Sequence, residues 1–165
     1  MGRPILFKQL RTGKNEIEFT FYKFRTMTTK DLDQEITDED RITRIGNFLR
    51  QTSLDEIPSF FNVLKGEMGL VGPRPLLPEY LPLYSKKHRK RHLIKPGITG
   101  WAQINGRNTI TWEEKFDLDI WYLENKTIFL DIKILFLTLY KVFKADGISP
   151  DGNKIMPKFK GKEKD

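Results

Sequence analysis

The stretch RQTSLDEIPSFFNVLKGEMGLVGPRP, residues 50–75, joins the features around which the rest of the chain is arranged. Two adjacent carboxylates, Asp55 and Glu56, stand at the predicted start of a short helix, and a glycine-rich turn after it ends in Arg74 between two prolines. Glycines in such a turn let backbone N–H groups approach an anion. The prolines restrict Arg74, so less entropy is lost when its guanidinium grips a phosphate, although the same residues suit an ordinary exposed turn.

The predicted helix has one apolar face. We place its start at Asp55, which keeps Pro58 in the first turn, and its end at Gly66. The spacing i, i+3, i+4, i+7 that predicts the apolar face is formed by Ile57, Phe60, Phe61 and Leu64. A helix N-terminus favours negative charge, so we expect Asp55 to stay ionised near neutral pH. An ionised carboxylate can attack phosphorus or bind a metal; the alternative is that it only complements the helix dipole.

The composition indicates one soluble domain with a basic charge. The chain has 165 residues, of which 38% are hydrophobic and 31% are charged, so it can build a core and is not disordered. Its 29 Lys and Arg residues exceed its 22 Asp and Glu residues, which gives a formal net charge of +7. Such a charge suits an anionic partner: nucleic acid, a phosphorylated metabolite or an acidic lipid surface.

The scarcity of soft ligands restricts the metals that the chain can bind. It has no cysteine and only two histidines, His88 and His92, both in a basic run over residues 86–92. Disulfides and thiolate zinc sites are therefore excluded, and a histidine-based zinc site is disfavoured. Any metal should be a hard, oxygen-bound ion such as Mg²⁺. The basic run has two interpretations, a solvated helix face and a patch for nucleic acid or lipid head groups.

Two strands are predicted near the N-terminus, over residues 4–10 and 16–24, with a turn between them. Apolar and polar side chains alternate in the second strand, which is typical of a half-buried strand. This strand runs into the segment YKFRTM, residues 22–27, which contains Lys23 and Arg25. Interleaved basic and aromatic residues can bind phosphates or nucleic acid, but they also form the exposed basic face of many strands.

Two further arginines are placed where they can reach the carboxylates or a ligand. Arg50 ends a predicted helix over residues 41–50, in which Gly46 weakens the prediction. Its side chain projects toward Asp55, with a simple salt bridge as the alternative role. Arg107 follows a predicted strand over residues 98–104 and the tight-turn pair NG, so it can reach a ligand from a loop.

Two helices are predicted in the C-terminal half, over residues 111–124 and 127–144. The first begins with a capping box, and we expect its Trp121 to face the core and its Asp117 and Asp119 to face solvent. The second carries Asp131 in its first turn, where an acidic residue is expected on dipole grounds. Its apolar run is too short and too charged to span a bilayer. A loop over residues 28–40 and a loose tail over residues 146–165 complete the chain.

Five segments, in this order, resemble the bacterial monotopic phosphoglycosyl transferases. These sugar transferases begin the assembly of N-linked glycans, capsules and O-antigens on a polyprenol carrier. The resemblance covers nearly the whole chain and fits best the small type that consists of the catalytic core. It is carried by YKFRTM (22–27), SLDEIP (53–58), NVLKGEMGLVGPRP (62–75), KPGITGWAQINGR (95–107) and WY (121–122).

The resemblance implies a reaction and a set of site residues. A UDP-sugar donates sugar 1-phosphate to polyprenol phosphate, such as undecaprenyl phosphate, and the products are polyprenyl diphosphate-sugar and UMP. The catalytic dyad of the family falls on Asp55 and Glu56, with Asp55 as the nucleophile that forms an aspartyl phosphosugar. The implied cofactor is Mg²⁺, with Asp55 and Asp131 as metal-side residues. The implied phosphate- and nucleotide-binding residues are Lys23, Arg25, Arg50, Arg74 and Arg107.

The charges of the chain agree with this assignment. A diphosphate is repelled by two carboxylates unless cations intervene, and Mg²⁺ together with clustered arginines would supply them. The role of Glu56, in positioning a metal or in handling a proton, stays open. The resemblance to the N-glycan initiators also implies an N-acetylated sugar, of the bacillosamine type, in the donor.

The predicted architecture is a compact α+β domain, mainly helical with short β-hairpins, over residues 1–165. Family members normally open with a hydrophobic helix that dips into the membrane, and this chain begins about where that helix ends. We therefore expect a soluble truncation or a natural short form of a parent at the cytoplasmic face of the bacterial inner membrane, without nucleic acid as a partner. Two other functions stay open: a basic module that binds anionic lipid or nucleic acid without catalysis, and a nucleotide-sugar hydrolase.

Overall fold

A computed structural model describes residues 3–28, 41–106, 110–144 and 158–161. The strands are β1 (Leu6–Thr12), β2 (Glu18–Phe24), β3 (Gly69–Val71) and β4 (Gly97–Thr99). The α-helices are α1 (Arg44–Gln51), α2 (Phe60–Leu64), α3 (Lys86–Arg89), α4 (Trp101–Asn105), α5 (Trp112–Asn125) and α6 (Ile128–Lys144). The 3₁₀ helices are η1 (Lys14–Glu16), η2 (Leu54–Ser59), η3 (Pro78–Leu83) and η4 (Lys90–Leu93). The predicted α+β class, mainly helical with short strands, is confirmed.

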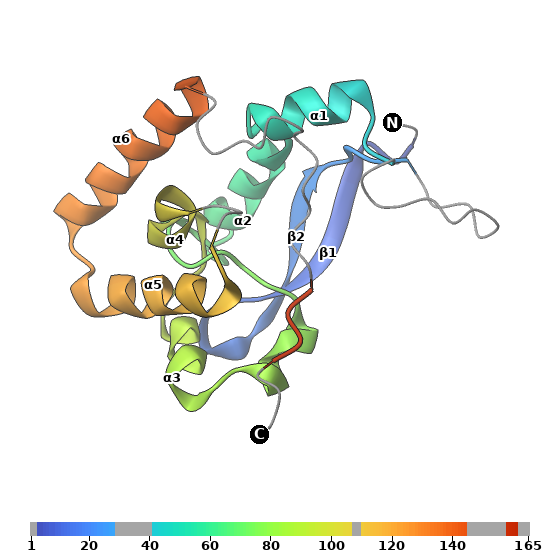
Figure 1. Ribbon diagram of the computed structural model, residues 1–165. Helices are drawn as coiled ribbons and strands as arrows, with labels where there is room; N and C mark the ends of the chain where they lie inside the picture. The colour runs from blue at the N-terminus through green and yellow to red at the C-terminus, as the bar shows by residue number, and fades with distance from the viewer. Residues whose placement is uncertain (1–2, 29–40, 107–109, 145–157, 162–165) are drawn as a thin grey trace.

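The elements form a compact body with the β1–β2 hairpin on one side and the α5–α6 pair on the other. The short helices α2 and α4 lie between these two sides (Figure 1). β1 and β2 are antiparallel, with the register running from Leu6↔Phe24 to Thr12↔Glu18, so the predicted hairpin is confirmed. Phe19 and Phe21 of β2 are buried against Met68, which fixes the apolar face of the hairpin toward the body.

The helix α1 packs closely on the end of the hairpin. Thr43 caps it, because its hydroxyl accepts a hydrogen bond of 3.0 Å from the backbone N–H of Gly46. A Cβ at position 46 would lie 1.9 Å from the carbonyl oxygen of Thr26, so only glycine permits this approach. The residue that weakened the helix prediction is thus the one that the packing requires. This packing brings the C-terminal turn of α1, with Arg50, to the end of β2.

The helix predicted to begin at Asp55 is built as two pieces. The 3₁₀ helix η2 begins at Leu54, directly after Ser53 in a left-handed conformation with φ of 57°, and α2 continues it. Asn62 of α2 is fully buried and joins it to β2. Its side-chain N–H donates to the carbonyl of Thr20 over 2.7 Å, and its oxygen accepts from the N–H of Tyr22 over 3.3 Å. The pieces are therefore fixed on the hairpin by a polar side chain.

The predicted strand over residues 98–104 is wrong beyond its beginning. β4 stops at Thr99, and residues from Trp101 form α4 instead of a strand and a tight turn. A short apolar run does not distinguish a strand from a buried helix. Here the helix is favoured over a strand because it buries Ile104 in the core, against Val71, Tyr122 and Ile134. β4 pairs in parallel with β3, directly before the turn that carries Arg74.

The two C-terminal helices are confirmed with small shifts of their ends. The capping box of α5 is formed between Thr111 and Glu114. Two of the predicted orientations are exchanged, however. Asp119 is only 3% exposed, whereas Trp121 is 41% exposed and stacks on Trp101. Asp119 can be buried because Arg91 of η4 forms an ion pair with it. The helical spacing of α5 alone does not reveal this partner.

Part of the tail that was predicted to be loose is packed on the body. Phe159 lies in an aromatic cluster with Tyr80, Tyr84, Trp112 and Phe116. The short described segment 158–161 returns to the body beside η3 in Figure 1. The remaining tail residues, and residues 29–40 of the predicted loop, lie outside the described residues.

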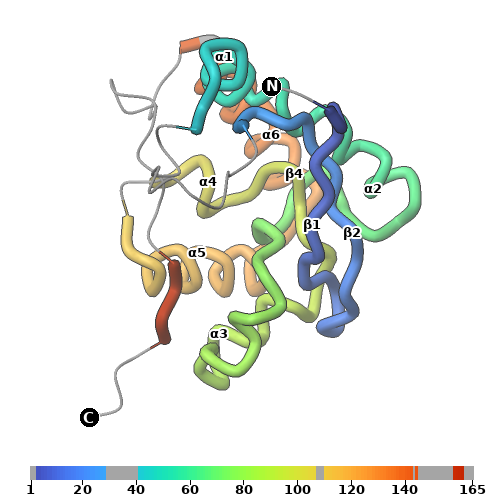
Figure 2. The backbone as a smooth tube through the Cα atoms, turned by 90° about the vertical axis from the view of Figure 1, so that its right-hand side faces the viewer, coloured from blue at the N-terminus to red at the C-terminus, as the bar shows by residue number. Residues whose placement is uncertain are grey.

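Many large apolar side chains lie on the outside of the helices instead of in the core. The predicted apolar face of η2 and α2 is exposed, with values from 48% for Ile57 to 83% for Leu64. α1, α2 and α6 lie in the upper half of the molecule, and α3 lies at the opposite end (Figures 1 and 2). Within the described ranges, no helix is long and apolar enough to cross a bilayer.

Candidate active site

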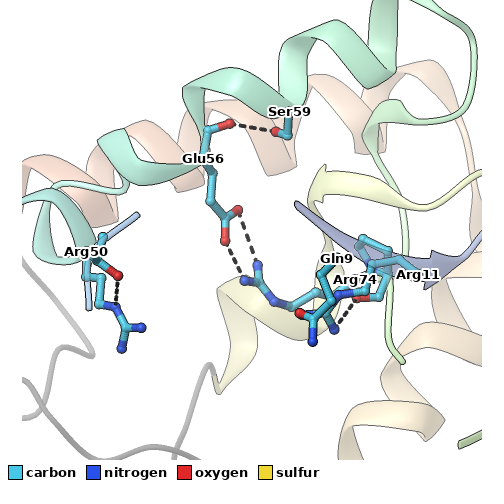
Figure 3. Close-up of polar contacts among 8 residues, drawn as sticks. Gln9, Arg11, Arg50, Glu56, Ser59 and Arg74 are labelled. Atoms are coloured by element: carbon cyan, nitrogen blue, oxygen red, sulfur yellow. Dashed lines mark hydrogen bonds and ion pairs between the residues drawn. The ribbon is translucent and has the colours of Figure 1, made fainter. Parts of the chain in front are cut away.

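The two carboxylates of the central stretch lie on η2, between α1 and α2. Asp55 is nearly buried, with 7% of its surface exposed. Glu56 forms a two-pronged ion pair with the guanidinium of Arg74, shown in Figure 3. The left-handed Ser53 stands two residues before Asp55, and such strained backbone is concentrated at functional sites. The structure thus sets one sheltered carboxylate beside one that is held by an arginine.

The environment of Asp55 makes its negative charge costly but not isolated. Burial and the neighbouring charge of Glu56 raise its pKa above the ordinary value for aspartate, while Lys23, Arg74 and Arg50 act in the opposite direction. From the sequence, we expected the helix N-terminus to keep Asp55 ionised. In the structure, burial and the neighbouring charges determine its pKa instead. A poorly solvated carboxylate beside cations is what a nucleophile for an anionic substrate requires.

Arg74 reaches this pair of carboxylates from the turn after β3. Its side chain remains 49% exposed while it holds Glu56. An ion pair with one half-exposed partner contributes little to stability, so the guanidinium can exchange Glu56 for a phosphate at a small energetic cost. Its planar fork fits two phosphate oxygens at once. The predicted neighbourhood of Asp55, Glu56 and Arg74 is present in the structure.

Arg50 and Lys23 complete the predicted group of cations around Asp55. The Nε of Arg50 donates a hydrogen bond of 2.8 Å to the hydroxyl of Thr26, which orients the guanidinium at the end of α1 (Figure 3). Lys23 is partly buried on β2, and its burial together with the charge of Arg50 lowers its pKa to about 8. The structure therefore brings Lys23, Arg50 and Arg74 within electrostatic reach of Asp55.

Two further cations near Arg74 were not found from the sequence. Arg11 on β1 donates to the carbonyl of Pro75 over 3.3 Å and to Gln9 over 2.7 Å, and it lies beside Arg74 in Figure 3. Burial and the charge of Arg74 lower the pKa of Arg11 to about 10. Lys115 on α5 has its pKa lowered to about 8 by burial and by Arg74. Neither residue belongs to a recognisable motif, and only the fold brings them to the turn.

The remaining predicted site residues are Arg25, Asp131 and Arg107. Arg25 donates to the carbonyl of Pro4 over 2.8 Å in an exposed position at the end of β2. Asp131 accepts a hydrogen bond of 2.5 Å from the hydroxyl of Tyr122. It is not among the charges with the largest effects on the pKa of Asp55, so its part in a metal site stays a prediction. Arg107 lies outside the described residues.

A hard cation fits the carboxylates only with help from a substrate. Among the residues that the structure describes, no group of three or more His, Asp or Glu side chains is arranged to hold a metal. Asp55 and Glu56 are nevertheless adjacent, and the charge of each disfavours that of the other. Mg²⁺ is commonly held by one or two carboxylates together with substrate phosphates and water, which matches this pair.

The basic run over residues 86–92 is largely used inside the molecule. Five of its seven side chains are engaged: Lys87 and His88 bind Asp117, Arg89 binds Glu16, and Arg91 and His92 are buried. Burial and Arg91 lower the pKa of His92 to about 4, so this histidine is neutral at physiological pH. The run is therefore mainly a structural element of the body.

Comparisons with known proteins place this arrangement in a family. The model of the family described as bacterial sugar transferase matches residues 1–145, which include every site residue discussed above. The chain belongs to the bacterial sugar transferase family. This finding confirms the resemblance that the five sequence segments indicated.

Several relatives within the sugar transferase family are known by name. The uncharacterized sugar transferase EpsL of Bacillus subtilis is 52% identical over 163 residues, which cover 98% of this chain and 81% of EpsL. The UDP-glucose:undecaprenyl-phosphate glucose-1-phosphate transferase of Escherichia coli is 41% identical, over 85% of this chain and 33% of the relative. The undecaprenyl-phosphate galactose phosphotransferase of Salmonella typhimurium is 38% identical, over 88% of this chain and 35% of the relative. The chain thus spans most of EpsL but about a third of the other two.

Proposed function

We propose that the chain transfers a sugar 1-phosphate from a UDP-sugar to polyprenol phosphate, giving polyprenyl diphosphate-sugar and UMP. The observation that carries the proposal is the sheltered carboxylate of Asp55 within reach of Lys23, Arg50 and Arg74. The names of the relatives support the substrate class, since two of them transfer a sugar phosphate to undecaprenyl phosphate. A module that only binds anions has no use for two carboxylates among its cations.

The proposed reaction has two displacement steps at phosphorus. A carboxylate oxygen of Asp55 attacks the β-phosphorus of the UDP-sugar, and the bond from that phosphorus to the bridging oxygen breaks. UMP leaves with the bond electrons, and an aspartyl phosphosugar remains. An oxygen of polyprenol phosphate then attacks the same phosphorus and releases the carboxylate of Asp55. Two easier displacements thus replace one direct transfer between two anions.

The cations of the site determine where the diphosphate binds. Lys23 and Arg50 act electrostatically on Asp55, and Arg74 exchanges its Glu56 partner for a phosphate oxygen. Their charges offset the repulsion between the donor and the carboxylates, and they stabilise the charge that develops on phosphorus. Asp55 and Glu56 would hold Mg²⁺, whose chemistry is to neutralise phosphate oxygens.

The test is UMP release from a panel of UDP-sugars with Mg²⁺, in the presence and absence of undecaprenyl phosphate. The panel contains UDP-glucose, UDP-galactose, UDP-N-acetylglucosamine and UDP-bacillosamine. We expect one donor to give UMP continuously only when undecaprenyl phosphate is present, and a mass adduct on the protein when it is absent. Full turnover without undecaprenyl phosphate would indicate a hydrolase instead, and no UMP with any donor would indicate a binding module.

The pH dependence of the reaction provides a separate prediction about Lys23. Its pKa of about 8 means that it loses its proton, and with it the attraction for phosphate, as the pH rises through that value. We therefore expect kcat/KM for the UDP-sugar to fall above about pH 8, since this parameter reports the free enzyme. In Lys23→Arg the fall should disappear, because a guanidinium stays protonated. Lys115→Arg is the control, and loss of the fall in that variant instead would assign it to Lys115.

We further propose that the outer faces of α1, η2, α2 and α6 rest on the membrane that carries the acceptor. Each presents large exposed apolar side chains: Ile45, Phe48, Leu54, Ile57, Phe60, Phe61, Leu64, Ile128, Phe129, Ile132, Phe136, Leu139 and Tyr140. Asp55 lies on η2, which contacts both α1 and α2, so these faces would bring the phosphate head of a membrane lipid close to it. The net charge of +7 favours an anionic surface.

Vesicle binding tests the proposed membrane face. The variant Phe48→Ser/Phe61→Ser removes two side chains of that face, and each loss should weaken binding about tenfold or more because burying a phenylalanine is worth about 1.5–3 kcal/mol. Vesicles of phosphatidylglycerol and phosphatidylcholine are the probe. Ile17→Ser is the matched control, because Ile17 is also exposed but lies at the hairpin turn, away from these helices. Equal losses in the variant and in the control would exclude this face.

A further inference from the structure

A buried ion pair lies behind Arg74, and the proposed reaction does not use it. Arg91 and Asp119 are each only 3% exposed. The Nε and Nη2 atoms of Arg91 both donate to Oδ2 of Asp119, over 2.9 and 2.7 Å. Burying two charges generally gives no net stability compared with an apolar pair of the same size. A further contact of Arg91 indicates what the buried charge does.

That contact is with the backbone of the site. The same Nη2 atom of Arg91 donates to the carbonyl oxygen of Arg74 over 2.8 Å, and Nη1 lies 3.4 Å from the hydroxyl of Tyr84. Asp119 on α5 therefore fixes the guanidinium of Arg91, which also bonds the backbone of Arg74, the residue paired with Glu56. The connection runs from the long helix α5 to the turn from which the exposed side chain of Arg74 projects.

The turn needs such support because its prolines cannot donate. Pro73 and Pro75 have no N–H, so this part of the chain is held through its carbonyl oxygens. The carbonyl of Pro73 accepts from the N–H of Gly97 over 3.0 Å, and that of Pro75 accepts from Arg11 over 3.3 Å. The carbonyl between them, that of Arg74, is the one held by Arg91. Three successive carbonyls are thus held from three different elements.

We infer that Arg91, oriented by Asp119, is a positioning residue that sets the backbone from which Arg74 reaches the donor phosphates. The expected effect on catalysis rests on the proposed function. The anchoring of the Arg74 backbone by Arg91 does not depend on that function. An arginine fork suits this task, because one planar group can bond a carboxylate and a carbonyl at the same time and stays charged at all relevant pH values. Without the anchor, the guanidinium of Arg74 would be spread over several positions. Misplacement of about 1 Å can reduce a rate by about a hundredfold.

The test removes the anchor without leaving a charge alone in the core. Arg91→Met/Asp119→Leu replaces both partners by apolar side chains, and such replacements are often neutral for stability. We expect a Tm close to that of the wild type and a kcat/KM for the UDP-sugar reduced by about 10- to 100-fold. Arg89→Met/Glu16→Gln is the matched control, because it removes an exposed ion pair from the same segment and should leave kcat/KM unchanged.

A double-mutant cycle separates positioning from a general loss of structure. In an Arg74→Ala background the Arg91→Met/Asp119→Leu change should reduce kcat/KM no further, because the effect passes through Arg74. An equal loss in both backgrounds would overturn the inference. If the double variant does not fold, Arg91→Lys serves in its place: it keeps the charge beside Asp119 but a single ammonium cannot also reach the carbonyl in the same fork geometry.

Hydrogen exchange tests the anchor independently of any activity. The backbone N–H groups in the peptide covering residues 70–77 should exchange faster in Arg91→Met/Asp119→Leu and in Arg91→Lys than in the wild type. Exchange in α5 should be unchanged in these variants. In the control variant Arg89→Met/Glu16→Gln, exchange over residues 70–77 should also be unchanged. Unchanged exchange over residues 70–77 in Arg91→Met/Asp119→Leu would overturn the inference. Faster exchange in a protein that releases no UMP from any donor would instead leave the anchor standing and reject the proposed function.

Discussion

Replacement of Asp55 by asparagine is expected to abolish both the covalent phosphosugar adduct and the release of UMP. The amide has the shape of the carboxyl group but cannot act as the attacking oxygen, so no intermediate forms. Mass spectrometry of the protein after incubation with the donor measures the adduct directly. An adduct of undiminished amount would show that another residue is the nucleophile.

The same substitution is expected to raise the Tm at neutral pH. Burial and Glu56 raise the pKa of Asp55 above the value of an unfolded chain. Folding therefore favours the protonated group, and ionisation at neutral pH opposes folding. Asparagine cannot ionise, so folding of the variant does not carry this cost. The difference in Tm between the variant and the wild type should shrink as the pH falls to about 4, near the pKa of aspartate in an unfolded chain.

A second carboxylate gives the opposite sign and serves as the control for stability. Lys87 and His88 lower the pKa of Asp117, so its charged form is favoured in the folded state. Asp117→Asn should lower the Tm at neutral pH and leave the adduct intact. A lower Tm for Asp55→Asn, measured by thermal unfolding at pH 7, would contradict the described environment of Asp55.

Arg74→Ala is expected to reduce kcat/KM by about a thousandfold or more, in the range found for arginines that stabilise a phosphoryl transition state. The fold should be retained, because the side chain of Arg74 is half exposed and surface ion pairs contribute about 1 kcal/mol or less. Steady-state UMP release gives the rate, and circular dichroism checks the fold.

Two further variants make the Arg74 prediction specific. Arg74→Lys should recover only part of the loss, since an ammonium does not reproduce the two-pronged contact. Arg89→Ala removes an arginine that is also half exposed and paired with a glutamate, Glu16, and should have no effect on kcat/KM. Unchanged kinetics in Arg74→Ala would place the donor phosphates elsewhere.

The sequence predicted the centre of the site better than its surroundings. Asp55, Glu56 and Arg74 lie within one stretch whose spacing and turn chemistry are local, so their proximity could be read without a fold. Lys23 was predicted from a basic and aromatic segment and Arg50 from its place at the end of a helix, and the packing of Gly46 on Thr26 explains how Arg50 comes near. Arg25 is not among the cations that act most on Asp55, and its side chain donates to the carbonyl of Pro4 instead.

The residues that were missed, or wrongly oriented, depend on partners far away in the chain. Asp119 was predicted to face solvent because a carboxylate on a helix usually does, and only the fold brings Arg91 to it. Arg11 lies on a strand and Lys115 on a helix, without any local signal of function. Phe159 was assigned to a loose tail for the same reason, since its aromatic partners belong to η3, to Tyr84 directly after it and to α5.

The buried amide of Asn62 has a consequence for the newly made protein. It joins α2 to the hairpin, and with it brings η2, the helix that carries Asp55, next to the strand that carries Lys23. A chain in which this amide is still hydrated holds its carboxylates and its lysine apart. A chain still emerging from the ribosome therefore has no assembled site, and the proposed function implies that it would react with nucleotide sugars only after its tertiary structure is complete.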